Sequence, residues 1–145
     1  PVNQFVAGFV GDPPMNFMDC ELEVSGEKWE LVNESFRINL PPDLVDRYKE
    51  NNGDPSSSSR EMVLGVRPEN FIVSDKKAGE ESFPADVYVT EPLGEEMIVD
   101  IKITNNKLKL KTSVDKDIKA GDKIWLDPMK KKMHLFNRKT EKAYF

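Results

Sequence analysis

The chain has 145 residues, of which 38% are hydrophobic, and this is enough to bury the core of one domain. Its net charge of -5 hides an uneven distribution, since residues 1–104 carry 21 acidic and 9 basic side chains and residues 105–145 carry 5 acidic and 12 basic ones. No apolar run approaches the roughly 20 residues of a membrane-spanning helix, and a single cysteine excludes an intrachain disulfide, so we expect a soluble domain.

The amino-terminal residues predict a short helix followed by a hairpin. Apolar side chains recur at helical spacing over residues 1–11, and Gly11 stands where such a helix would end. Two prolines then break the chain. From Met18 to Ser25 apolar and polar residues alternate, as they do in a half-buried strand, and a turn that begins at Gly26 leads back through residues 29–40. The runs on either side of that turn are expected to pair.

The middle of the chain predicts one more helix, a polar loop and a bent strand. Asp43 to Tyr48 shows the cap and the spacing of one or two helical turns. Residues 51–60, NNGDPSSSSR, form a polar segment that we interpret as a surface connection. Apolar residues then alternate from Met62 to Val66, break at residues 67–68 and resume at residues 71–73, which predicts a strand with a bent exit.

Residues 85–103 predict a β-hairpin with a projecting corner. Because successive side chains of a strand point to opposite faces, alternation places on the core face the side chains of Ala85, Val87, Val89, Met97, Val99, Ile101 and Ile103. Between the two runs, Pro92 fixes φ and removes a ladder donor, while Gly94 can adopt a positive φ. The corner Glu91 to Glu96 is therefore expected to leave both strands and to stand clear of the sheet.

The last third of the chain predicts three more strands. The first has an apolar face and a lysine face, formed by Lys107, Lys109 and Lys111. This basic part of the chain either neutralises an acidic surface of the other part and is solvated, or it forms a basic patch for an anionic partner. Further strands are expected at residues 124–126 and 133–136, and a polar turn would return residues 143–145 against the last one. Many short strands with little helix predict a small antiparallel β-barrel or sandwich.

Catalytic and metal-binding chemistry finds little support in the residues. His134 is the only histidine and Cys20 lies in an alternating apolar row, which excludes a multi-histidine metal site and provides no convincing Cys-His pair. The sequence contains no G-x-x-x-x-G-K-[ST] phosphate loop. We therefore expect no catalytic residue, no metal site and no cofactor in this chain.

Four segments, in a fixed order, resemble one family. They are PVNQFVAGFVGDPPMNF at residues 1–17, LGVRPENF at residues 64–71, EPLG at residues 91–94 and HLFNRKTEKAYF at residues 134–145. Together they resemble the carboxyl-terminal part of the ATP-binding subunits of maltose-type and multiple-sugar ABC importers, over nearly the whole chain. Asn137 and Glu141 depart from the Asp and Gly that are common in this family, which leaves the shape of the last turn open.

The resemblance implies a noncatalytic regulatory domain of the transport-associated OB type, an elaborated β-barrel. Residues 1–14 would be the junction helix and linker from a missing ATPase domain, and residues 15–145 the OB-like regulatory domain. The side chains of Phe5, Val6 and Phe9 would pack on the barrel or on that missing domain. In the family such domains pair with a second copy and can receive regulatory proteins, while the upstream domain binds ATP and magnesium. The parent subunit would couple ATP hydrolysis to sugar uptake, in the cytoplasm and bound to the transporter's membrane subunits.

Two other functions remain open on the residues alone. An independent OB-type module that binds nucleic acid would combine a basic groove with aromatic side chains that stack on bases. The lysines of residues 107–111 and 130–132 supply charge, but the nearby aromatic residues, Trp125 and Phe136, have the pattern of core residues. Direct binding of a sugar by the barrel is the third function. We expect neither nucleic acid nor sugar to bind.

Contact with a partner protein is expected at two segments that proline and glycine lift off the sheet and that charged residues flank. The alternative is ordinary turn chemistry, with a surface pair between an arginine and a carboxylate that contributes about 1 kcal/mol or less. The candidate contact residues are Arg67, Pro68, Glu69, Glu91, Pro92, Leu93, Gly94 and Glu95.

Overall fold

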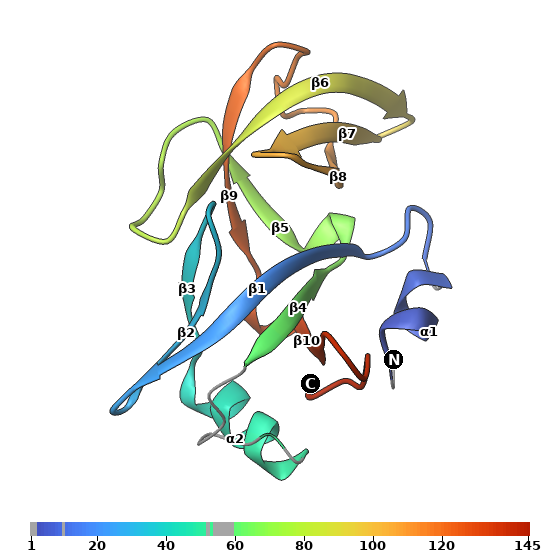
Figure 1. Cartoon of the computed structure of the whole chain (residues 1–145). Coiled ribbons are helices and arrows are strands. Elements are labelled where there is room, and N and C mark those ends of the chain that lie inside the picture. Colours follow the sequence, from blue (N-terminus) through green and yellow to red (C-terminus); the bar gives the residue numbers. More distant parts are fainter. Residues whose placement is uncertain (1–2, 10, 52, 54–59) are drawn as a thin grey trace.

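The computed structural model describes residues 3–9, 11–51, 53 and 60–145, whose strands form two five-stranded antiparallel sheets (Figure 1). The prediction of a mostly β, antiparallel fold with a short amino-terminal helix is confirmed. Which strands belong to which sheet was not indicated by the sequence pattern. Among the described residues, no helix is long and apolar enough to span a membrane.

The first sheet has the strand order β10-β4-β1-β2-β3. Its strands are β1 (Asn16–Ser25), β2 (Lys28–Val32), β3 (Arg37–Asn39), β4 (Glu61–Val66) and β10 (His134–Asn137). The hairpin predicted at Gly26 is confirmed, because Ser25 pairs with Lys28 across a two-residue turn. The apolar run of residues 29–40 is divided between two strands, which pair with each other.

The second sheet has the strand order β5-β9-β6-β7-β8. Its strands are β5 (Phe71–Ser74), β6 (Phe83–Leu93), β7 (Glu96–Ile103), β8 (Asn106–Ser113) and β9 (Lys123–Pro128). The single-turn helix η1 (Pro68–Asn70) leads from the first sheet into the second, and η2 (Lys130–Lys132) leads back to β10. The chain therefore crosses between the sheets twice, and each sheet contains segments that are distant in sequence.

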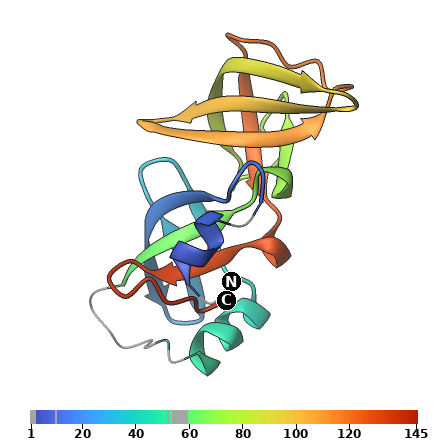
Figure 2. The same ribbon diagram turned by 90° about the vertical axis from the view of Figure 1, so that its right-hand side faces the viewer.

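Two groups of buried side chains hold the fold together. The larger one joins the inner faces of both sheets, with Leu31 and Leu64 from the first and Val99 and Leu126 from the second. Helix α1 (Gln4–Phe9) lies over one face of the first sheet (Figure 2), and the smaller group is buried between the two. It consists of Ala7, Met15, Val63 and Phe136. Because both faces of β4 are covered, its burial does not follow the predicted alternation.

Both predicted helices form, with changed bounds. Helix α1 is confirmed over residues 4–9, and Gly11 follows it with a φ of 100°, in the left-handed region that favours glycine. Residues 1, 2 and 10 of the predicted helix lie outside the described residues. Helix α2 (Pro42–Glu50) has Pro41 at its N-cap, so the prediction that Asp43 caps it is wrong. Residues 52 and 54–59 of the predicted loop also lie outside the described part of the chain.

Two expectations for the hairpin of β6 and β7 are wrong. A register shift between Val87 and Val89 turns the rest of β6, so that Val89 is 46% exposed instead of buried. Strand β6 also continues through Pro92 to Leu93, which pairs with Glu96, so the predicted corner is part of the ladder. The pairing of β6 with β9 ends at Asp86, and a proline fits beyond that point because its missing N–H faces no partner strand. Only Gly94 and Glu95 form the turn.

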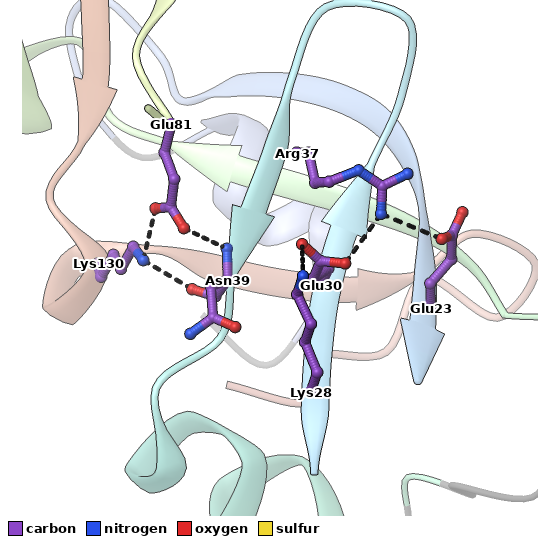
Figure 3. A network of polar contacts seen from close by, with 7 residues as sticks. All are labelled: Glu23, Lys28, Glu30, Arg37, Asn39, Glu81 and Lys130. Carbon is purple, nitrogen blue, oxygen red and sulfur yellow. Dashed lines mark hydrogen bonds and ion pairs between the residues drawn. The ribbon is translucent and has the colours of Figure 1, made fainter. Parts of the chain in front are cut away.

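Polar contacts tie the edge strand β3 to Glu81, in the connection between β5 and β6, and to Lys130, in η2 (Figure 3). The backbone N–H of Asn39 donates to Glu81 Oε2 at 2.9 Å, and Lys130 Nζ donates to the carbonyl oxygen of Asn39 at 2.8 Å. Lys130 Nζ lies 2.7 Å from Glu81 Oε1, which closes the network. Beside it, Arg37 bonds Glu23 and Glu30 within the first sheet. These contacts satisfy backbone groups of an edge strand that would otherwise be open to another chain.

Removing the cation of this network should cost stability. Lys130→Met leaves Glu81 without its ion-pair partner and the Asn39 carbonyl without a donor, and we expect the free energy of unfolding to fall by about 1 kcal/mol, since these side chains remain one-third exposed. Lys131→Met, an exposed neighbour in η2, is the matched control and should change stability by less than about 0.5 kcal/mol. Urea unfolding measures both, and equal losses would contradict this role of Lys130.

Candidate functional site

A groove of about 730 Å³ brings together two of the sequence-predicted contact residues, Glu69 and Glu95. Glu69 lies on η1 and Glu95 lies in the turn between β6 and β7. The other lining residues come from the starts of β5 and β7, from the end of β8 with the turn after it, and from Met129. The groove therefore lies between η1, which links the two sheets, and the turn of the β6–β7 hairpin.

Backbone pairing fixes the walls of the groove. Strand β7 pairs with β8 from Glu96 opposite Ser113 onward, and the N–H of Val114 donates to the carbonyl oxygen of Glu95 at 3.0 Å. Helix η1 packs against β8, and the N–H of Met129 donates to the carbonyl oxygen of Asn70 at 2.8 Å. The walls are thus held by main-chain bonds, which any side chain permits, while the lining side chains determine what the groove can bind.

The groove combines negative charge with exposed apolar surface. It is lined by the carboxylates of Glu69, Glu95, Glu96 and Asp115 and by one cation, Lys111, whose Nζ lies 3.6 Å from Glu96 Oε1. Val114 and Met129 are 38% and 37% exposed. These groups offer both charged and apolar contacts to another molecule.

The remaining predicted contact residues lie apart from the groove. Pro68 is buried in η1, and Arg67, the residue before η1, lies close to Gly11, where an added Cβ would be 2.9 Å from Arg67 Nη1. The side chains of β6 from Glu91 to Leu93 are exposed along the hairpin, and Gly94 adopts a φ of 67° in its turn. Of the eight predicted residues, two thus share the groove and six do not.

Several lining residues had not been selected as contact residues from the sequence. Glu96 belongs to the predicted corner, and its charge was a usable signal. Lys111 was assigned to the lysine face of its strand, and Asp115 falls in the turn that follows. Nothing in the sequence marked Met129 as a contact residue, because it lies at the groove only as a result of the path that the chain takes after β9. Long-range contacts of this kind carry no local pattern.

The lysines and aromatic residues that motivated the nucleic-acid hypothesis are partly engaged within the chain. Lys109 Nζ lies 2.6 Å from Asp100 Oδ1, and Lys107 Nζ lies 5.9 Å from the centroid of the Tyr88 ring. Phe136 is buried, as expected, whereas Trp125 is half-buried and lies under Lys77, so the prediction that Trp125 belongs to the core is wrong. Binding of nucleic acid or of a sugar stays untested.

The residues with catalytic potential lie in structural positions. Burial raises the pKa of the Cys20 thiol to about 12, so it stays protonated at neutral pH and is a poor nucleophile. His134 is half-buried in β10, and burial lowers its pKa. Within the described residues, no group of three or more histidine, cysteine, aspartate or glutamate side chains is placed to hold a metal ion.

The structure defines the shape of the last turn, which the sequence had left open because of Asn137 and Glu141. Asn137 Oδ1 accepts from the N–H groups of Lys139 and Thr140 at 2.9 and 3.0 Å, as an aspartate would. Glu141 has a φ of 63°, the left-handed conformation that favours glycine. The return of the chain is confirmed, because the N–H of Tyr144 donates to the carbonyl oxygen of Leu135 at 2.7 Å.

Relieving the backbone conformation at Glu141 should stabilise the chain. Glu141→Gly removes a Cβ from a left-handed residue, and we expect the free energy of unfolding to rise by about 0.5 to 1 kcal/mol after the entropy of the unfolded chain is counted. Lys139→Gly, in the same turn but without a positive φ, is the matched control and should lower it. Thermal unfolding of the two variants compares them, and destabilisation by both would contradict the assignment.

Two family models match the chain in tandem. The MalK OB fold domain matches residues 11–71, and the TOBE domain matches residues 64–136. Similar curated proteins include an uncharacterized ABC transporter ATP-binding protein, YurJ, of Bacillus subtilis (strain 168), 33% identical over 100% of this chain and 39% of its own length. The trehalose/maltose import ATP-binding protein MalK of Thermococcus litoralis is 32% identical over 100% of this chain and 38% of its own. The sn-glycerol-3-phosphate import ATP-binding protein UgpC of Salmonella paratyphi A is 30% identical over 97% and 36%.

A solved structure shows the same arrangement of strands. The cytoplasmic molybdate-binding protein ModG superposes with a TM-score of 0.62 at 8% sequence identity, over 83% of this chain and 94% of that one. At this identity the likeness concerns the fold alone. The chain spans 39% of the length of YurJ and 38% of the length of MalK, so the properties of those whole proteins extend beyond what this chain contains.

Proposed function

Because the chain belongs to the TOBE domain family and carries a MalK-type OB fold, we propose that it is the noncatalytic regulatory and dimerisation domain of the ATP-binding subunit of a sugar ABC importer. The tandem match of the two family models, over residues 11–136, carries this proposal. Relatives that are named as importers of trehalose/maltose and of xylose/arabinose support it.

The ATPase chemistry of the proposed parent subunit would lie in a preceding segment. This chain has no phosphate loop, so its residues do not fit an ATP and magnesium site, and we assign both to the parent. The parent would couple ATP hydrolysis to sugar uptake, at the cytoplasmic face of the membrane, through the transporter's membrane subunits. Reading the sequence encoded before Pro1 tests this: we expect a phosphate loop there, and a native start at this position would contradict it.

Helix α1 offers a surface for that preceding segment. Phe5 and Phe9 are 66% and 75% exposed, and their rings contact each other edge to face, with centroids 4.8 Å apart. The first sheet buries Ala7 of this helix but not the two rings. Of the two expected partners for the rings, the barrel and the ATPase domain, the barrel therefore does not cover them. Exposed aromatic pairs are costly to leave in water, and we assign this face to contact with the ATPase domain, in agreement with the junction proposed for residues 1–14.

The groove is the proposed contact for a regulatory protein. Its four carboxylates favour a partner with basic groups, and its exposed Val114 and Met129 add apolar area. In cells that carry the full-length subunit, Glu69→Lys with Glu95→Lys should leave basal sugar uptake intact and abolish its regulation. Glu27→Lys with Glu34→Lys makes the same change of charge in turns of the first sheet. Unchanged regulation in the groove variant, or equal loss in the control, would contradict the assignment.

Substitution of Gly94 tests the hairpin turn more locally. Gly94→Asp forces an aspartate to adopt a φ of 67°, and we expect a cost of about 1 to 2 kcal/mol in unfolding free energy together with impaired regulation of uptake. Gly79→Asp is the control, because Gly79 also has open space around it but no positive φ. If Gly94→Asp matched Gly79→Asp in both measurements, the turn would have no special role.

Dimerisation is tested on the chain itself. The family resemblance implies pairing with a second copy, and light scattering gives the molar mass in solution directly. We expect a mass above 16.6 kDa that rises with concentration. A monomer at all concentrations would remove dimerisation by this domain alone and would leave its regulatory contacts to be tested as above.

A further inference from the structure

The buried side chain of Asn16 bonds to backbone groups of both sheets. It is the first residue of β1 and is 7% exposed. Its Nδ2 donates to the carbonyl oxygen of Val66, in β4, at 3.1 Å and to that of Lys109, in β8, at 2.8 Å. Its Oδ1 accepts from the N–H of Lys109 at 2.9 Å. The carboxamide thus takes both backbone groups of Lys109, as a neighbouring strand would at the edge of the sheet.

The two strands that Asn16 joins lead into opposite walls of the groove. Val66 ends β4 and is followed by η1, which carries Glu69. Lys109 is followed along β8 by Lys111, which lines the other wall. The carboxamide of Asn16 thus holds both segments, at Val66 and at Lys109. A hydrogen bond tolerates a change of only a few tenths of an ångström in its donor–acceptor distance. Asn16 therefore adds side-chain hydrogen bonds to the main-chain contacts that hold the two walls in place.

Asn16 also follows the segment that joins α1 to the first sheet. Met15, its neighbour, is 4% exposed and is buried with Ala7 of α1. A displacement of α1 therefore reaches Asn16 through a packed side chain and one peptide bond. This is a contiguous physical connection between the helix assigned to the ATPase contact and the groove assigned to the regulator.

We propose that Asn16 is a positioning residue that couples the α1 junction to the groove by holding η1 and β8 at a fixed separation. The functional meaning of this coupling rests on the proposed function of the groove. The hydrogen bonds and their effect on the groove are properties of this chain alone, and they can be measured without any partner.

Amide exchange and methyl chemical shifts in the labelled chain test the proposal. Asn16→Ala removes all three bonds, and Asn16→Asp keeps an acceptor but removes both donors. We expect Asn16→Ala to speed exchange of the Lys109 amide at least tenfold, equivalent to about 1.4 kcal/mol, and Asn16→Asp, which keeps the acceptor of that N–H, to speed it less. Both variants should shift the methyl resonances of Met129 and Val114, because both lose the bonds to the carbonyl oxygens of Val66 and Lys109. Asn33→Ala, which removes bonds to Asp19, Ser35 and Phe36 within the first sheet, should change neither.

A double-mutant cycle tests the coupling to α1. Met15→Ala should shift the Met129 methyl resonance when Asn16 is present and should have little effect when Asn16 is alanine. Equal shifts in the two backgrounds, or Lys109 exchange within twofold of the original chain in Asn16→Ala, would overturn the proposal.

The unmodified chain provides a test that does not depend on folded variants. The Nδ2 protons of Asn16 should exchange at least tenfold more slowly than those of Asn33, whose side-chain bond to Asp19 is exposed. Equal rates would overturn the proposal. Failure of the groove variants to alter regulation would instead remove the proposed function while leaving slow exchange at Asn16 and Lys109, so the two failures are distinguishable.

Discussion

Replacing Phe136 by alanine should lower the free energy of unfolding by about 3 to 5 kcal/mol, the range for truncation of a fully buried aromatic ring. The ring is 0% exposed, lies between the first sheet and α1, and contacts the Phe17 ring edge to face, with centroids 5.9 Å apart. Its removal leaves a cavity beneath α1 that the surrounding strands cannot close. We therefore also expect faster amide exchange at Ala7, because α1 loses the buried ring against which it packs.

Phe5→Ala is the matched control for this loss. It removes the same side chain from α1 itself, where the ring is 66% exposed, and should cost less than about 1 kcal/mol. Urea unfolding of the two variants separates burial from residue type. A cost at Phe5 equal to that at Phe136 would show that α1 packs through its other face and would contradict the arrangement described here.

Gly65→Ala should destabilise the chain by about 1 to 3 kcal/mol, the usual cost of overpacking. An added Cβ would lie 2.5 Å from Met15 Sδ and 3.0 Å from Phe136 Cε2, both in buried side chains with little freedom to move. Both faces of β4 are buried at this point, and the neighbouring side chains leave no room for a Cβ. This explains why a glycine stands in the middle of the strand.

Gly79→Ala provides the opposite expectation at a glycine with open surroundings. An added Cβ there meets no atom within 4 Å, so the substitution should be neutral or stabilise by about 0.4 to 1 kcal/mol. The measurement is thermal unfolding.

Combining Gly65→Ala with Met15→Ala should recover part of the stability that Gly65→Ala loses, since the shorter side chain at position 15 leaves room for the added methyl group. An additive double variant would contradict the proposed clash.

Local periodicity predicted most strands because one face of each is buried. It succeeded for the core face of β7, where Met97, Val99, Ile101 and Ile103 are all buried. It failed for Val89, because a bulge reverses the faces and leaves no mark on the apolar pattern. It also failed for Val63, whose burial depends on α1 and Phe136, residues distant in the sequence.

Proline and glycine predicted the ends of strands and the turns less reliably. Gly94 adopts a positive φ, as predicted, and Gly11, which was predicted to end its helix, does so too, because glycine has no Cβ to clash. Pro92 was expected to end its strand and does not, because the need for an N–H depends on which neighbour a strand has, and that is settled by the sheet order. For the same reason the sequence predicted Glu69 and Glu95 separately but not their meeting in one groove.

We propose that this chain provides contacts and no catalysis in a larger transport ATPase. ATP hydrolysis by the purified 145-residue chain, with magnesium present, tests it most directly. We predict a rate indistinguishable from that of buffer, because the chain carries no phosphate loop and its described acidic residues form no metal site. Sustained release of phosphate that co-purifies with the chain and disappears when it unfolds would contradict the account.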